Sequence, residues 1–104
     1  MPTTKEKADD SSELVRVHLI ISGKVQGVYF RKHTQETSID NHVRGWVKNL
    51  DNGNVECILE GTKSNVYNVV EWCHIGPPQG RVDNVQIIQD DNTYTGKFSD
   101  FKIL

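Results

Sequence analysis

The chain has 104 residues, a formal net charge of −2 and 36% hydrophobic residues. This length suffices for one globular domain with one hydrophobic core and is too short for two. The slightly acidic balance does not favour a dedicated nucleic-acid or membrane-surface protein. No apolar run approaches the length of a membrane-spanning helix, and the first residues lack the apolar core of a signal peptide. We therefore expect a soluble, cytoplasmic protein.

The first 13 residues are mostly Lys, Asp, Ser, Thr and Glu. Such a segment cannot bury enough apolar surface to offset the entropy lost on ordering, so we expect residues 1–13 to form a flexible polar tail and residues 14–104 to form the domain. Apolar residues alternate from the start of the domain. They share one parity, which predicts a half-buried strand: Val15, Val17, Leu19 and Ile21.

The strand leads into a glycine-bounded segment, Ile21-Ser22-Gly23-Lys24-Val25-Gln26-Gly27-Val28-Tyr29-Phe30-Arg31. Glycines at a strand-to-helix turn allow positive φ, so backbone N–H groups can turn inward and form a concave anion site. The N-terminus of the next helix adds a positive partial charge, and Arg31 places a basic side chain where the helix dipole disfavours one. These features favour a phosphate-binding loop with an arginine clamp. A tight turn followed by a solvated arginine is the alternative.

A weakly amphipathic helix is expected over residues 30–40, followed by a hairpin with strands over residues 43–49 and 55–60. The helix is expected to bury Phe30, Thr34, Thr37 and Ser38. The turn is Leu50-Asp51-Asn52-Gly53. The inward parity of the hairpin contains Val43, Gly45, Val47, Asn49, Val55, Cys57 and Leu59, and the outward parity contains Glu56 and Glu60.

Ser64 is the expected N-cap of a second helix, which Gly76 and the following prolines end. Its apolar stripe is Val66, Val69, Val70 and Cys73. A strand over residues 82–88, a polar loop over residues 90–95 and a short last strand over residues 98–104 complete the chain. The order β-α-β-β-α-β predicts an α+β, ferredoxin-like sandwich: an antiparallel sheet with two helices on one face.

Asn49 ends its strand with the parity of the inward residues. If that parity faces the helices, its carboxamide lies on the same side of the sheet as the glycine-rich loop. A carboxamide has both a donor and an acceptor, so it can hold a water against a bound phosphoryl group. An asparagine-rich turn chosen for local backbone hydrogen bonds is the alternative.

Two motifs together resemble the acylphosphatase family. The first, aliphatic-x-Gly-x-Val-Gln-Gly-Val-x-Phe-Arg, is matched throughout by residues 21–31. The second is Gly-aromatic-small-x-Asn, three residues, Gly-x-Val, five residues and Gly. It is matched by Gly45, Trp46, Val47, Asn49, Gly53, Val55 and Gly61. The resemblance extends over about residues 15–104.

The resemblance implies metal-independent hydrolysis of small acyl phosphates to a carboxylate and inorganic phosphate, without a cofactor. In such enzymes the arginine that matches Arg31 binds the phosphate together with backbone N–H groups of the loop. The asparagine that matches Asn49 positions the attacking water. The matching loop residues are Lys24, Val25, Gln26, Gly27 and Val28. We expect a monomer with no nucleic-acid or membrane partner.

The chain departs from the family at two places. Asn41-His42 stands where many members have an apolar residue and then glycine, and we expect Asn41 to adopt the left-handed conformation that ends the first helix. Tyr29 occupies the variable position of the first motif.

Three other functions share parts of this pattern. A noncatalytic anion-binding or peptide-binding module of the same fold would not need Asn49. An RNA-recognition domain has the same element order, but it expects exposed aromatic residues on the strand where this chain has Glu56 and Glu60. A phosphomonoesterase needs a proton donor or a metal for its alkoxide leaving group, and the two motifs supply neither.

Cys57 and Cys73 form no Cys-x-x-Cys pair, and we expect buried thiols rather than a disulfide or a zinc site. Three histidines fall on different expected faces or elements, so no metal site is expected: His33, His42 and His74.

Overall fold

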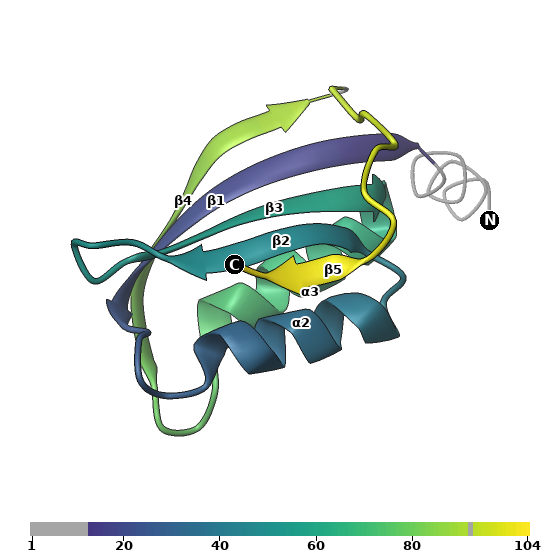
Figure 1. Ribbon diagram of the computed structural model, residues 1–104. Helices are drawn as coiled ribbons and strands as arrows, with labels where there is room; N and C mark the ends of the chain where they lie inside the picture. Colours follow the sequence, from purple (N-terminus) through teal and green to yellow (C-terminus); the bar gives the residue numbers. More distant parts are fainter. Residues whose placement is uncertain (1–12, 92) are drawn as a thin grey trace, which may run out of the picture.

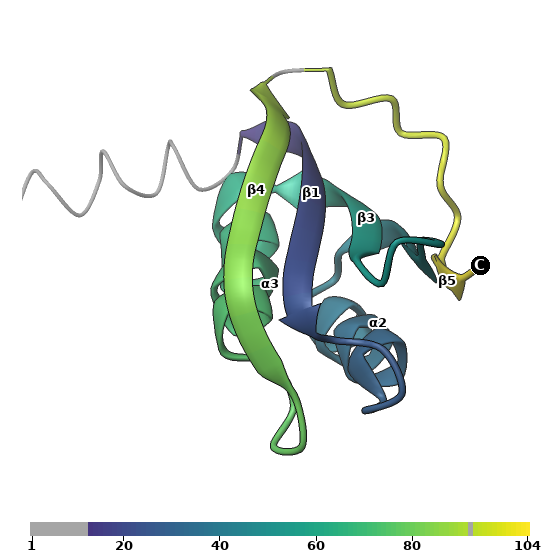
Figure 2. The ribbon, with the colours of Figure 1, turned by 90° about the vertical axis from the view of Figure 1, so that its left-hand side faces the viewer.

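The computed structural model describes residues 13–91 and 93–104. In chain order its elements are β1 (Leu14–Lys24), α2 (Phe30–Asp40), β2 (Arg44–Asn49), β3 (Val55–Thr62), α3 (Lys63–Ile75), β4 (Arg81–Asp91) and β5 (Phe101–Ile103). The strands form one sheet in the order β4-β1-β3-β2-β5, and both helices cover the same face of it (Figures 1 and 2). The α+β, ferredoxin-like sandwich is therefore confirmed.

The sheet is mixed rather than purely antiparallel. The four longer strands pair antiparallel, whereas β5 lies parallel to β2, with Val47 opposite Ile103. The chain from β4 to β5 passes from one edge of the sheet to the other (Figure 1). This crossing brings a short segment from the end of the chain beside the hairpin that carries Asn49.

The core lies between the sheet and the helices. The predicted alternation of β1 is confirmed, because its four inward residues are at most 3% exposed. The apolar stripe of α3 is buried as predicted. In α2 the inner face contains Phe30, Thr34 and Ser38, and Thr37 is half-buried. The hydroxyl of Thr34 donates to the carbonyl oxygen of Phe30 at 2.8 Å, which explains how a weakly apolar helix buries a threonine.

The prediction that Ser64 caps α3 is wrong. The helix begins at Lys63 and Thr62 is its N-cap residue, so Ser64 lies within the first turn. Strand β3 continues to Thr62 because Leu14 pairs with that residue. The N–H of Lys63 then donates to the carbonyl oxygen of Glu13 at 2.7 Å. Residues 1–12, the rest of the predicted tail, lie outside the described residues.

The predicted boundaries of the last two strands are also corrected. Strand β4 runs to Asp91, into the predicted loop, because it stays paired with β1 as far as Arg16. The pairing of β4 with β1 has two register shifts, at His18/Leu19 and Ser22/Gly23. These shifts interrupt the alternation of apolar residues from which the length of β4 was predicted. Strand β5 contains only three of the seven residues expected.

Helix α2 ends in a different way from the prediction. Asn41 has a φ of −101°, and the positive φ of 58° belongs to His42. The side-chain amide of Asn41 instead donates to the carbonyl oxygen of Thr37 at 2.8 Å. The asparagine therefore satisfies a carbonyl of the last helical turn, and the histidine makes the turn into β2.

Glu60 lies on the sheet face opposite the helices, as its parity predicts, but it is only 1% exposed. Arg16 donates to its carboxylate at 2.9 Å, and the segment after β4 adds bonds from the backbone N–H groups of Thr95 and Gly96. A buried carboxylate is stable only when it is paired and hydrogen-bonded. Glu60 thus anchors the segment that leads to β5.

The two cysteines are free and buried. A side-chain hydrogen bond with Cys73, together with burial, raises the pKa of the Cys57 thiol well above its usual value. The prediction of buried thiols is confirmed. Among the described residues, no helix has the length and apolar character needed to cross a membrane.

Candidate active site

The glycine-rich loop leaves β1 through two positive-φ glycines, as predicted. Gly23 has a φ of 128°, and a Cβ there would lie 2.2 Å from the carbonyl oxygen of Arg81. Gly23 therefore permits both the unusual backbone and the close approach of β1 to β4. Gly27 has a φ of 76° with open space beside it. At position 27, therefore, glycine is favoured by the backbone conformation alone and not by a lack of space.

Gln26 ties this loop to the hairpin turn. Its side-chain amide donates at 2.8 Å to the carbonyl oxygens of both Leu50 and Asn54. The turn itself is closed by a bond from the N–H of Leu50 to the carbonyl oxygen of Asn54. The loop and the end of β2 are thereby held in one arrangement. The first motif predicts a phosphate-binding role for Gln26, and the sequence has no signal for this second role of its side chain.

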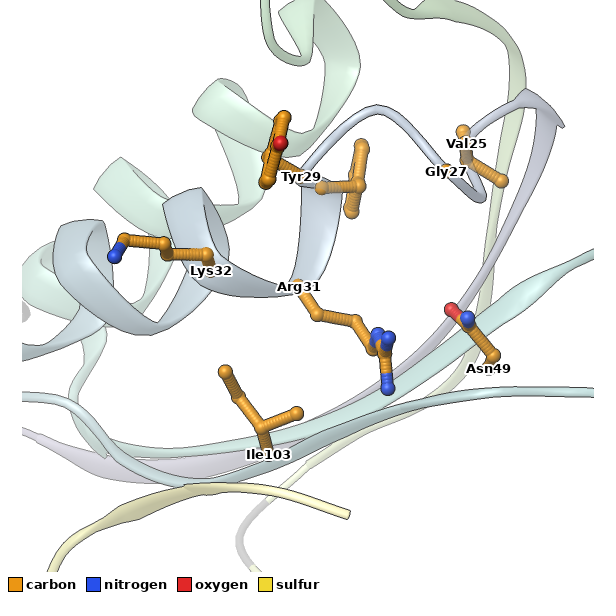
Figure 3. A pocket seen from close by; sticks show the side chains of 8 residues that line it. Val25, Gly27, Tyr29, Arg31, Lys32, Asn49 and Ile103 are labelled. Atoms are coloured by element: carbon orange, nitrogen blue, oxygen red, sulfur yellow. The ribbon is translucent and has the colours of Figure 1, made fainter.

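Arg31 lies in the first turn of α2, where no acidic side chain is present. The helix starts after Tyr29, which has a left-handed backbone with a φ of 64°. The half-buried side chain of Arg31 extends toward Asn49 (Figure 3). Within residues 13–91 and 93–104, no ion pair or hydrogen bond neutralises its guanidinium. The positive end of the helix and an unpaired guanidinium together favour an anion at this point.

Asn49 is the last residue of β2 and faces the helices, like Val47. Its side-chain oxygen is buried, and no described residue donates a hydrogen bond to it. Buried polar atoms in proteins are nearly always hydrogen-bonded, so an unpaired acceptor beside a cleft is unusual. Figure 3 shows this carboxamide directed into the cleft toward Arg31. The alternative, an asparagine that serves only local backbone hydrogen bonds in the turn, does not explain this orientation.

These side chains border an open cleft of about 350 Å³. It is lined by Val25, Gly27, Tyr29, Phe30, Arg31, Lys32, Asn49 and Ile103. Of the seven predicted site residues, the lining contains Val25, Gly27, Arg31 and Asn49. The other three lie in or beside the same loop but do not line the cleft: Lys24, Gln26 and Val28.

Four residues of the cleft lining were not predicted as site residues, among them Phe30, which begins α2 and is buried in the core. Lys32 follows Arg31 on α2, and Tyr29 precedes the helix. Ile103 enters from β5, held beside β2 by a bond from the N–H of Leu104 to the carbonyl oxygen of Val47 at 2.9 Å. The sequence contains no local signal for the position of Ile103, because it depends on pairing between strands far apart in the chain.

Among the described residues, the lining of the cleft has two basic residues and no carboxylate. One wall is a loop that turns its backbone with positive φ, and the other wall has an amide oxygen without a hydrogen-bond donor. Such a site is suited to an oxyanion with a polar molecule next to it, since cations and N–H groups bind the anion and the amide orients its neighbour.

Comparisons with known proteins agree with one another. A family model described as Acylphosphatase matches residues 17–103. An acylphosphatase of Syntrophus aciditrophicus (strain SB) is 46% identical over 89 residues, covering 86% of this chain and 91% of that protein. An acylphosphatase of Pyrobaculum arsenaticum is 47% identical over 93 residues, covering 88% and 96%. The solved acylphosphatase from Coxiella burnetii is 35% identical and superimposes with a TM-score of 0.81, covering 88% and 94%.

Proposed function

The chain belongs to the acylphosphatase family and hydrolyses acyl phosphates, and we propose that Arg31 binds the phosphoryl group while Asn49 positions the attacking water. Backbone N–H groups of residues 24–28 complete the phosphate site. The observation that supports this division of roles best is the buried, unpaired side-chain oxygen of Asn49, which faces Arg31 across one cleft.

The chemistry of the substrate fits this small set of groups. An acyl phosphate is a mixed anhydride whose leaving group is a carboxylate, so departure needs no proton donor. The water oxygen forms a bond to phosphorus, and the bond from phosphorus to the acyl oxygen breaks with its electron pair leaving on the carboxylate. The proton of the water passes to an oxygen of the phosphate. Such a loose phosphoryl transfer depends mainly on positioning and charge stabilisation, which the cleft supplies without a metal.

The roles are tested by steady-state hydrolysis of benzoyl phosphate in the presence of EDTA, with wild type, Arg31→Gln and Asn49→Ala. Each charge-assisted bond of Arg31 is worth about 1.5–3 kcal/mol, so kcat/KM of Arg31→Gln should fall by about two to four powers of ten. Arg31→Lys should recover only part of this loss, because lysine lacks the planar fork. Asn49→Ala should reduce kcat more than it raises KM.

Lys63→Gln is the matched control, since it removes an exposed cation at the start of the other helix. It should keep wild-type kcat/KM. Full activity in folded Arg31→Gln or Asn49→Ala would refute the assigned roles, and loss of activity with EDTA would refute metal independence.

We further propose that residues 14–104 act as one catalytic domain, as a monomer in the cytoplasm. The free thiols of Cys57 and Cys73 suit a reducing compartment. Sedimentation equilibrium at assay concentration tests the first part, and cell fractionation tests the second.

A further inference from the structure

Tyr29 lies at the rim of the cleft and is 69% exposed. It holds a left-handed backbone directly before α2, a conformation that residues with a side chain rarely adopt. Strained residues of this kind concentrate at functional sites, where they direct a side chain. Tyr29 has no assigned role in phosphate binding, so its position calls for another explanation.

The geometry of phosphoryl transfer separates the two sides of the cleft. The attacking water and the leaving oxygen lie roughly in line, on opposite sides of phosphorus. Asn49 projects from the sheet, so water held there attacks from the sheet side. The acyl group must then leave on the side of phosphorus that faces away from Asn49. Figure 3 shows Asn49 and Ile103 projecting from the sheet, and Tyr29 on the other side of the start of α2.

A second groove, of about 220 Å³, begins at Tyr29. It is lined by Val28, Tyr29, His33, Pro77, Pro78 and Gln79. Tyr29 lines both this groove and the cleft, so its side chain stands where the two hollows border each other. The groove lining is largely apolar and has no carboxylate and neither lysine nor arginine. His33 stacks on Trp72 with ring centres 6.3 Å apart.

We propose that Tyr29 and this groove bind the acyl group of the substrate, so that the enzyme prefers acyl phosphates with an aromatic or extended apolar acyl group. The inference rests on the proposed roles of Arg31 and Asn49. The aromatic ring offers a flat apolar surface, and the prolines continue it away from the phosphate. A short acyl group ends before the groove and gains nothing from it.

The test is the ratio of kcat/KM for benzoyl phosphate to kcat/KM for acetyl phosphate. In Tyr29→Ala the ratio should fall about tenfold, chiefly through the KM for benzoyl phosphate, because an aromatic contact is lost. Alanine keeps the Cβ and hence the same backbone strain, so the variant should fold. Tyr29→Phe should retain the wild-type ratio, because the ring and not the hydroxyl makes the contact.

Ile103→Ala is the matched control, since Ile103 is the exposed apolar side chain on the sheet side of the cleft. Its ratio should stay close to that of the wild type. A ratio that falls in Ile103→Ala and not in Tyr29→Ala would place the acyl group on the sheet side and overturn the proposal. An unchanged ratio in both variants would overturn it as well. Failure of the proposed function is distinct, because it appears as unimpaired hydrolysis by Arg31→Gln or Asn49→Ala.

A second variant tests the groove without altering Tyr29. Gln79 is exposed, so Gln79→Arg should fold and would place a cation in the groove. It should raise kcat/KM for succinyl phosphate, whose acyl group ends in a carboxylate, about threefold over wild type. Gln86→Arg adds the same charge to an exposed position on β4 and should not do so. An equal rise of kcat/KM in both variants would overturn the placement of the acyl group in the groove.

Discussion

The side-chain amide nitrogen of Gln26 lies 2.8 Å from the carbonyl oxygen of Asn54, so the glycine-rich loop is fastened to the turn that follows Asn49. A second bond of equal length reaches Leu50. The two halves of the proposed site come from different parts of the chain, and this glutamine joins them. Preorganisation of this kind determines whether a bound phosphate and a positioned water meet at a reactive distance.

Replacing Gln26 by methionine keeps the length of the side chain and removes both bonds. We expect the free energy of unfolding to fall by about 1–3 kcal/mol, because each net hydrogen bond contributes about 0.5–1.5 kcal/mol. We expect kcat/KM for benzoyl phosphate to fall by about tenfold or more, since a small displacement of the loop misaligns the site. Gln35→Met is the control, because Gln35 donates to Phe101 outside the loop. Equal losses of activity in both variants would contradict a specific role of Gln26.

Glu60→Gln removes the charge from a side chain that is 1% exposed. Arg16 loses its ionic partner, and the new amide group presents a donor to backbone N–H groups that need an acceptor. We expect the free energy of unfolding to fall by about 3 kcal/mol. Urea unfolding followed by tryptophan fluorescence measures this change. Glu71→Gln, on the exposed surface of α3, should be neutral, and a neutral Glu60→Gln would show that the carboxylate is dispensable.

The two glycines of the loop should respond differently to alanine. Gly27→Ala should reduce the free energy of unfolding by about 1 kcal/mol, because a positive φ is strained but the space beside it is open. Gly23→Ala should cost at least about 3 kcal/mol, since its Cβ would also meet the carbonyl oxygen of Arg81. Urea midpoints of the two variants give the comparison. Similar midpoints would mean that β4 moves away easily.

Neither cysteine should react with a thiol reagent in the native protein. Cys57 is fully buried, and its pKa is raised, so little thiolate is present at neutral pH. We expect labelling by 5,5′-dithiobis(2-nitrobenzoate) only when the protein unfolds, with a rate that follows unfolding. Unfolding in urea before the reagent is added supplies the control, since both thiols should then react at once. Rapid labelling in native buffer would contradict the burial of Cys57.

Much of the fold could be predicted because the local patterns are strong. The parity of Val15 to Ile21, the stripe of α3 and the hairpin turn all appear in the structure where the sequence placed them. Errors arose where a distant segment decides the outcome. Leu14 pairs with Thr62 in the sheet and thereby shifts the start of α3. Arg16 of β1 pairs with Asp91 and thereby extends β4. The secondary-structure propensities of a short stretch of sequence contain no information about either pairing.

The features of the candidate site likewise divide into those that local sequence determines and those that a distant segment determines. Arg31 and Asn49 are placed by a motif and by strand parity, and the structure brings them to one cleft. Burial of Glu60 could not be predicted, since its parity points away from the helices and the segment covering it belongs to a later part of the chain. The entry of Ile103 into the cleft required the parallel pairing of β5 with β2, for which the sequence has no local signal.

The parallel pairing of β5 also has a consequence for folding during synthesis. The ribosome makes the glycine-rich loop, Arg31 and Asn49 early, whereas Ile103 is made only after β4 is complete. The residues of the charged part of the cleft are therefore synthesised before its sheet-side apolar wall. The cleft gains this wall only when β5 pairs with β2.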